Sequence, residues 1–152
     1  MTDPITFSGT SPRFALPMLF AAQAQKEVFV NEGFALIDAL MHAAFEGESN
    51  MPPSSPADGQ CWLTGTAPTG EWAGQSGKLA CRSAGNWLFV TPRDGMRLLD
   101  RSTGQEHRYS GGWLAPAAPA APSGGATIDS EARSAIGAIV AALREAGIFP
   151  TG

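Results

Sequence analysis

The sequence has little charge and no excess of basic residues. Only 16% of its 152 residues are charged, against about 25% in ordinary soluble domains. Fourteen acidic residues outnumber ten basic ones, so the chain has no positive field to neutralise phosphates, and nucleic-acid binding is disfavoured. No apolar run reaches the roughly 18 residues of a membrane span, and we expect no membrane insertion. Residues 14–22 imitate a signal peptide, but Pro17 interrupts this short stretch and we expect no cleavage.

Cysteine is also scarce. Cys61 and Cys81 are the only two, and both lie in segments with the composition of strands. Neither has a CxxC partner or a neighbouring histidine, so they do not predict a zinc site. We interpret both as small buried hydrophobic residues in preference to a disulfide.

Glycine and proline are abundant, with 18 and 12 copies, about a fifth of the chain. Average usage is about 12%, and so many helix breakers exclude a helical bundle. A hydrophobic content of 43% supplies material for a core and argues against disorder. The predicted fold class is α+β: a small antiparallel β meander body, an N-terminal amphipathic helix and a C-terminal helix tethered by a linker.

The β body is predicted within residues 60–114, where short apolar runs alternate with glycine-containing turns about every ten residues. This spacing is typical of an antiparallel meander. The expected strands are residues 61–63, 78–82, 86–90, 96–99, 106–109 and 113–114. Residues 46–60, rich in proline and serine, are expected to be a loop.

The first helix is expected over residues 31–45, as the start of a helix-plus-β domain that spans residues 31–114. Asn31 is a good N-cap, and Glu32 suits the positive end of the helix dipole. The apolar stripe at helical spacing consists of Phe34, Ile37, Met41 and Ala44. Such an apolar helix has to be covered by the β body or by another subunit. Residues 1–30 are expected to be an extended docking segment. The sequence does not decide whether residues 21–30 belong to this segment or extend the helix upstream.

Residues 115–128 are an Ala/Pro/Gly linker, and they are followed by a C-terminal segment over residues 129–152. A helix is predicted from 129 to 147, capped by Asp129 or Ser130. Its apolar stripe at helical spacing includes Ile136, Ile139 and Leu143. This stripe has to fold back on its own domain or pack against copies of itself, because fewer than two heptads do not form a stable coiled coil alone.

The end of this helix has its own signal. Gly147 suits the left-handed position that follows a helix, and Ile148 is then placed to touch Leu143, as in a Schellman motif.

Enzyme motifs are missing. Residues 74–78 resemble a phosphate-binding loop but lack its earlier glycine and its final Ser or Thr. His42 and His107 lie far apart in the sequence and neither adjoins a nucleophile. We therefore expect no enzyme, no cofactor and no metal, and a wall or polysaccharide hydrolase is the least favoured function.

All four tryptophans lie within residues 60–114, and core packing accounts for most of them. Trp72 is the candidate for an exposed platform for a sugar ring, because it lies in a glycine-flanked loop. Glu71 and Gln75 are its polar neighbours, which we expect to bind hydroxyl groups. This arrangement is the basis of a carbohydrate-binding alternative.

Residues 22–26 read Ala-Gln-Ala-Gln-Lys, and they are followed by Asn-Glu at 31–32 and Ala-Leu-Ile-Asp-Ala-Leu at 35–40. Further motif segments occur at residues 56–59, 69–74, 85–87, 91–95 and 112–113. Over residues 12–114 the sequence resembles an uncharacterised domain family of tailed-phage, prophage and gene-transfer-agent virion proteins, mainly from alphaproteobacteria. The resemblance implies a virion structural protein of the head-spike or tail-fibre type that supports attachment to the host cell surface.

Members of this family are commonly symmetric, so the resemblance implies a homo-oligomer, a trimer or pentamer, in a particle assembled in the bacterial cytoplasm. The implied partners are other capsid, spike or tail proteins, with host surface polysaccharide as the alternative ligand. Candidate oligomer or docking residues are Gln23, Gln25, Lys26, Asn31, Glu32, Ile136, Ile139 and Leu143. The sequence ends after a linker and a helix, which favours an adaptor or spike base and leaves head or tail location open.

Overall fold

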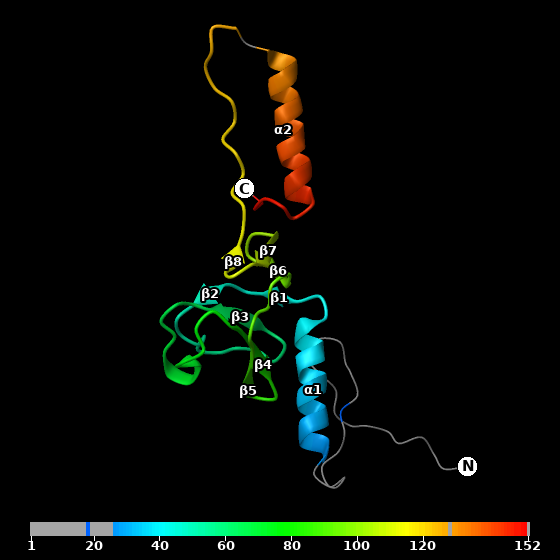
Figure 1. Cartoon of the computed structure of the whole chain (residues 1–152), viewed down its shortest axis with the longest axis vertical. Helices are drawn as coiled ribbons and strands as arrows, with labels where there is room; N and C mark the ends of the chain where they lie inside the picture. Colours follow the sequence, from blue (N-terminus) through cyan, green and yellow to red (C-terminus); the bar gives the residue numbers. More distant parts are fainter. Residues whose placement is uncertain (1–17, 19–25, 128, 152) are drawn as a thin grey trace, which may run out of the picture. The chain divides into compact units, whose positions relative to one another are not determined.

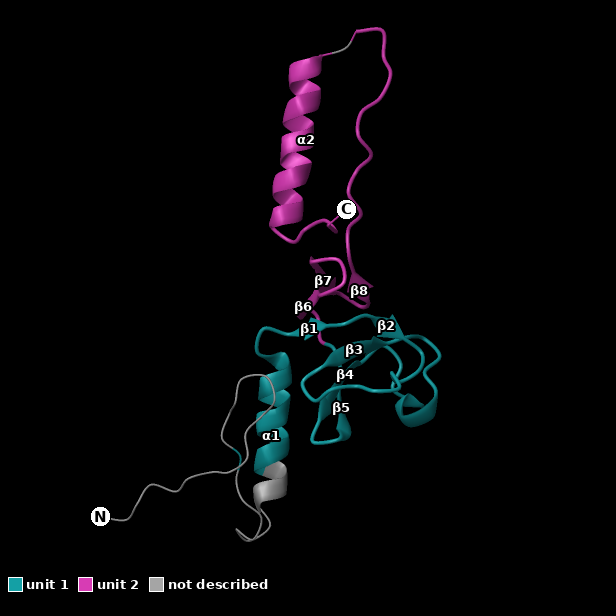
Figure 2. Cartoon of the chain, turned by 180° about the vertical axis from the view of Figure 1, so that it is seen from behind, with its two compact units in different colours: residues 1–92 teal, residues 93–152 magenta. Residues whose placement is uncertain are grey.

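The computed structural model describes residues 18, 26–127 and 129–151 (Figure 1). Within these residues it contains two α-helices and eight strands in two sheets, which confirms the α+β class. The chain forms two compact units, residues 1–92 and 93–152 (Figure 2). The boundary between the units falls inside residues 31–114, the range over which the sequence predicts one helix-plus-β domain.

Unit 1 contains a four-stranded sheet in the order β2-β3-β4-β5. Its strands are β2 (Glu48–Ser49), β3 (Cys61–Thr64), β4 (Leu79–Ser83) and β5 (Asn86–Val90). The last three form the predicted antiparallel meander, while β2 runs parallel to β3. The short β2 lies in the segment expected to be only a loop.

The hairpin between β4 and β5 turns through two residues with positive φ, Ala84 at 49° and Gly85 at 73°. Two consecutive left-handed residues give a turn whose twist matches that of the flanking strands. It brings Cys81 opposite Leu88, while Cys61 lies opposite Cys81 on the other side of β4. Both cysteines are buried and no disulfide joins them, as the sequence predicts.

Unit 2 contains β6 (Arg97–Asp100), β7 (Gln105–Tyr109) and β8 (Trp113–Leu114), paired antiparallel in that order. Leu98, Asp100 and Gln105 are buried. Arg97, Leu99, Glu106, Arg108 and Leu114, at the alternate positions, are exposed. The alternation follows the period of two of a strand, and it leaves one sheet face open.

Helix α1 (Lys26–Leu40) begins and ends earlier than the sequence predicts. Asn31 lies inside the helix and is not its N-cap, because a β-branched run such as residues 28–30 costs a helix only tenths of a kcal/mol per residue. The helix ends at Leu40, shortly before His42, whose φ is 50°. Phe45 then lies in β1 (Ala44–Phe45) and is buried there.

Helix α2 (Ser130–Glu145) has the predicted caps. Asp129 is the N-cap, and its side chain accepts a 2.8 Å hydrogen bond from the backbone N–H of Ala132. Gly147 has a φ of 71°, and the N–H of Ile148 donates to the carbonyl of Leu143 at 2.8 Å. These two features complete the predicted Schellman motif.

Candidate functional site

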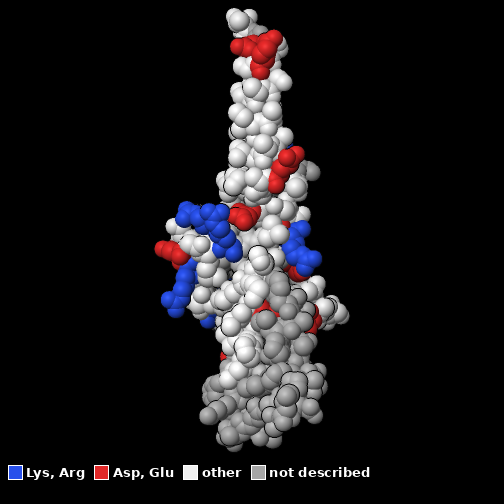
Figure 3. All heavy atoms as spheres, turned by 90° about the vertical axis from the view of Figure 1, so that its right-hand side faces the viewer, with Lys and Arg blue, Asp and Glu red and all other residues white. Residues whose placement is uncertain are grey.

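The apolar face of α2 is uncovered. None of its residues is buried, and the exposed fractions of Ile136 and Ile139 are 43% and 60%. Leu143, from the same predicted stripe, is half-buried. Figure 3 shows one face of this helix at the top of the picture. Acidic side chains lie near the two ends of the helix, and the surface between them is largely without charged side chains. A folded monomer therefore leaves this stripe in contact with water.

Hydrogen bonds hold the C-terminal end of α2 to the sheet of unit 2. The N–H of Glu106 donates to the carbonyl of Gly147 at 2.7 Å, and the N–H of Thr151 donates to the carbonyl of Thr103 at 2.8 Å. The buried amide of Gln105 donates to the carbonyls of Pro116 and Ile148 at 2.6 and 2.8 Å. The segment after α2 folds back on its unit, while the helix stripe does not.

The linker is also held to α2. The guanidinium of Arg133 donates to the carbonyl of Gly124 and, at 3.5 Å, to that of Pro122. These contacts join the N-terminal end of α2 to the linker, and the anchor at Gln105 holds the segment that follows α2 to the sheet of unit 2. The apolar stripe is therefore presented by a helix that is tethered near both of its ends.

Helix α1 adds a second apolar surface. Its buried residues are Ala35, Asp38 and Ala39, which line a small cavity together with Cys61 and Cys81. The apolar side chains with exposed fractions of 37–50% are Val30, Ile37, Leu40 and Met41. Of the predicted stripe, Ile37 is exposed and Phe34 is half-buried, while Met41 and Ala44 lie beyond the end of α1.

The other docking candidates have different surroundings. Asn31 is half-buried within α1, and Glu32 is exposed. Lys26 is the first residue of α1. Gln23 and Gln25 lie outside the described residues, so their predicted role at a subunit interface stays a prediction.

The structure corrects the expected exposure of Trp72. This side chain has no exposed surface and lies in the short 3-10 helix η1 (Gly70–Trp72). Its ring packs edge-on against Trp87 with the centroids 5.1 Å apart, and Trp87 packs in the same way against Trp62 at 5.7 Å. The indole face of Trp72 is a core contact and not a platform for a sugar.

Glu71 and Gln75, the predicted polar neighbours, are engaged within unit 1. Glu71 accepts a 2.8 Å hydrogen bond from the indole N–H of Trp87 and lies 4.0 Å from Arg82. The guanidinium of Arg82 lies over the Trp87 ring, 5.1 Å from its centroid. Gln75 accepts a 2.8 Å hydrogen bond from the ammonium of Lys78. Glu71 and Arg82 thus stabilise the aromatic cluster, whose centre is Trp87, a residue that the sequence did not single out.

The most perturbed buried carboxylate is Asp100, at the turn between β6 and β7. Burial alone would raise its pKa. Hydrogen bonds from the side chain and backbone of Ser102, a further one from Thr103 and the charge of His107 together lower the pKa below 3.8. His107 lies 3.7 Å from this carboxylate. The arrangement shapes a tight turn, in which the Ser102 hydroxyl donates a 2.6 Å hydrogen bond to the same carboxylate.

Within the residues that the structure describes, neither helix is long and apolar enough to cross a membrane. Among the same residues, no three metal-ligating side chains gather into a group.

A family model described as "Protein of unknown function (DUF2793)" matches residues 30–114, more than half of the chain. This match begins within α1, covers all eight strands and ends at the last residue of β8. A search of curated proteins finds no match.

Proposed function

We propose that this chain, which belongs to the DUF2793 family of proteins of unknown function and resembles virion proteins over residues 12–114, is a virion structural protein of a phage-like particle or gene transfer agent. In this proposal it is a head-spike or tail-fibre component, a base or adaptor that forms a homo-oligomer and supports attachment to the host cell surface. It acts through assembly and not as an enzyme.

The observation that carries the proposal is the uncovered stripe of α2, with Ile136 and Ile139 43% and 60% exposed. Burying an aliphatic side chain of this size contributes about 1.5–3 kcal/mol. A helix of 16 residues is marginal by itself in water, yet this one is capped at both ends and anchored through Gln105. An anchored helix with a free apolar stripe is suited to packing against copies of itself.

The exposed side of α1 supports the same interpretation, because Ile37, Leu40 and Met41 also remain in contact with water. A monomeric soluble protein rarely leaves a large contiguous apolar patch exposed. The resemblance of residues 12–114 to virion proteins supplies the kind of partner, namely other capsid, spike or tail proteins. Carbohydrate binding stays a prediction, now without a platform at Trp72.

The test is incorporation into particles. Phage-like particles are purified by density gradient from a bacterium that expresses the tagged chain, and the chain is quantified by mass spectrometry in the particle band. We expect a constant copy number per particle that is a multiple of the oligomer size. An Ile136→Asp/Ile139→Asp variant is expected to be depleted from the band.

The matched control is Ser134→Asp/Ala141→Asp, which places the same two charges on the opposite side of α2 at exposed positions. It is expected to enter the particles as the wild type does. Absence of the wild-type chain from purified particles would contradict the virion role.

A further inference from the structure

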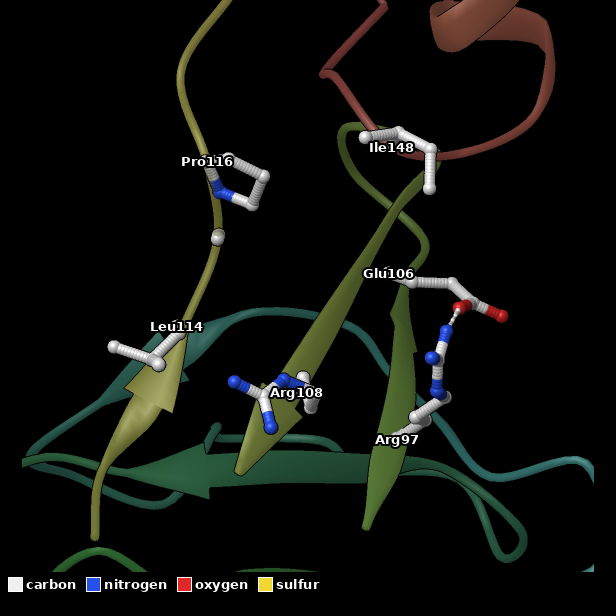
Figure 4. Close-up of a pocket in the computed structure, with 7 residues that line it drawn as sticks. Arg97, Glu106, Arg108, Leu114, Pro116 and Ile148 are labelled. Atoms are coloured by element: carbon white, nitrogen blue, oxygen red, sulfur yellow. Dashed lines mark hydrogen bonds and ion pairs between the residues drawn. The ribbon is translucent and has the colours of Figure 1, made fainter. Parts of the chain in front are cut away.

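Unit 2 contains a pocket of about 480 Å3 on the open face of its sheet (Figure 4). Its lining residues are Arg97, Glu106, Arg108, Leu114, Ala115, Pro116 and Ile148. Pockets of roughly 300–1,000 Å3 are the usual size for small ligands. We propose that this pocket binds a carboxylate carried by a short branched aliphatic group, the chemistry of a peptide that ends in a leucine-like residue or of a free branched acid.

The charge in the pocket is unbalanced. Arg97 and Arg108 are directly opposite each other on β6 and β7, and like charges at such positions repel. Glu106 accepts a 2.8 Å hydrogen bond from Arg97 and therefore offsets that arginine. Among the residues that the structure describes, Arg108 has no acidic partner. A carboxylate bound to Arg108 relieves the repulsion that the fold leaves in place.

The guanidinium of an arginine is better suited to binding a carboxylate than the compact ammonium of a lysine. The planar guanidinium presents parallel N–H groups that match the two oxygens of a carboxylate. In Figure 4 the Arg108 side chain lies between Leu114 of β8 and Arg97 of β6, so it is open to an incoming anion on the pocket side. Arg108 is an exposed residue, which means that binding does not require the sheet to open.

The apolar part of the pocket faces the same space. Leu114 is on the strand beside Arg108, directly opposite it in register. Pro116 and Ile148 lie at the other end of the pocket in Figure 4. The exposed fractions of Leu114 and Ile148 are 49% and 37%, so both side chains present apolar surface to a branched aliphatic group in the pocket.

These two walls are fixed before a ligand arrives. The buried amide of Gln105 donates to the carbonyls of both Pro116 and Ile148. The side chain of one residue thereby holds the segment after β8 and the segment after α2 at a set spacing. Preorganised walls reduce the entropy that binding has to overcome. The pocket does not depend on self-association through α2, because none of its lining residues lies in that helix.

The experiment is an NMR titration of the full chain, followed at the Arg108 side-chain N–H and the Leu114 and Ile148 methyl groups. The probes are N-acetyl-leucine, which represents a peptide end, and 4-methylpentanoate, which represents a free acid. N-acetyl-leucinamide has the same apolar body without the carboxylate. Acetate and inorganic phosphate supply negative charge without the aliphatic group.

We expect saturable shifts at all three groups with one or both branched acids, and the tighter of the two identifies the source of the ligand. Arg108→Gln is expected to weaken this binding by about tenfold or more, as the loss of a charge-assisted hydrogen bond implies. Leu114→Ser removes part of the apolar wall and also weakens it. Arg93→Gln, an exposed arginine outside the pocket, serves as the matched control and leaves it unchanged.

Three results would overturn the proposal: equal binding of the acid and the amide, acetate or phosphate binding as tightly as the branched acids, and no saturable shift at these groups. Arg108 is exposed, so its variant keeps the fold, and unchanged resonances elsewhere in unit 2 verify this.

Discussion

Trp72 lies in a loop segment of the sequence, but its side chain is part of the core. It lies between glycines in the sequence, yet the loop closes over it through backbone hydrogen bonds from Trp72 to Thr69 at 3.1 Å and from Gly77 to Thr64 at 3.1 Å. Its ring is then fully buried against Trp87. The consequence is that Trp72 contributes to stability.

We predict that Trp72→Ala lowers the free energy of unfolding by about 3–5 kcal/mol, the usual cost of removing a buried aromatic side chain. Denaturant titration measures it. Trp72→Phe is the matched variant, and it is expected to lose less. It keeps the ring contact and removes an indole N–H that has no partner among the described residues. An alanine variant within about 0.5 kcal/mol of the wild type, the range of ordinary surface substitutions, would refute the core role.

Asp100 gives the chain a defined acid sensitivity. Its pKa is lowered in the folded state despite burial, chiefly by the hydrogen bonds from Ser102. A lowered folded pKa stabilises the protein above the unfolded value of about 3.9, and this contribution is lost as the pH falls through the folded pKa. We therefore predict that Asp100→Asn is less stable than the wild type at pH 7 and that the gap narrows below about pH 4. Thermal unfolding across this range checks it, and a gap independent of pH would contradict it.

At the scale of elements, Gln105 connects the sheet of unit 2 to both the linker and the segment after α2. Its amide is buried and donates to the carbonyls of Pro116 and Ile148. Replacing it by an apolar residue leaves two carbonyls without their donor, at a cost of about 1–3 kcal/mol for each group that stays buried.

We predict that Gln105→Leu accelerates hydrogen exchange at the amides of Glu106 and Thr151, which bond to the carbonyls of Gly147 and Thr103. Exchange measured by NMR at these two positions is the readout. Gln75→Leu removes a glutamine of unit 1 that bonds to Lys78, and it is expected to leave both amides unchanged. Equal protection in the Gln105 variant would show that the anchor does not depend on this side chain.

Local signals predicted most elements. The glycine turns located β3 to β8, and the caps Asp129 and Gly147 located α2, because turn and cap chemistry acts over a few residues. The short β2 was missed, since its two residues pair only because β3 lies beside them. The bounds of α1 were wrong because tertiary packing overrides the small propensity cost of residues 28–30.

The candidate site divides in the same way. The stripe of α2 was visible as helical spacing, and its exposure follows from the linker before it. The burial of Trp72 and the pocket at Arg108 depend on loop closure and on strand register, and neither is encoded in any short segment. The position of Gln105 between two distant carbonyls is likewise a product of the folded chain.

At the scale of the whole molecule, the proposed oligomer explains both the low charge and the uncovered helices. The exposed apolar side chains include Ile136 and Ile139 on α2 and Ile37 and Leu40 on α1. Only 16% of the residues are charged, so few charged side chains surround these apolar surfaces. In an oligomer these surfaces are buried. We therefore predict that the wild-type chain self-associates at working concentrations and does not remain a dispersed monomer.

The most direct measurement is the molar mass of the purified chain by light scattering after size-exclusion chromatography. We predict a trimer or pentamer for the wild type and for Ser134→Asp/Ala141→Asp. For Ile136→Asp/Ile139→Asp we predict a monomer whose sheet content, measured by circular dichroism, is retained. A wild-type monomer at every concentration tested, or an unchanged mass in the Ile136→Asp/Ile139→Asp variant, would contradict assembly through α2.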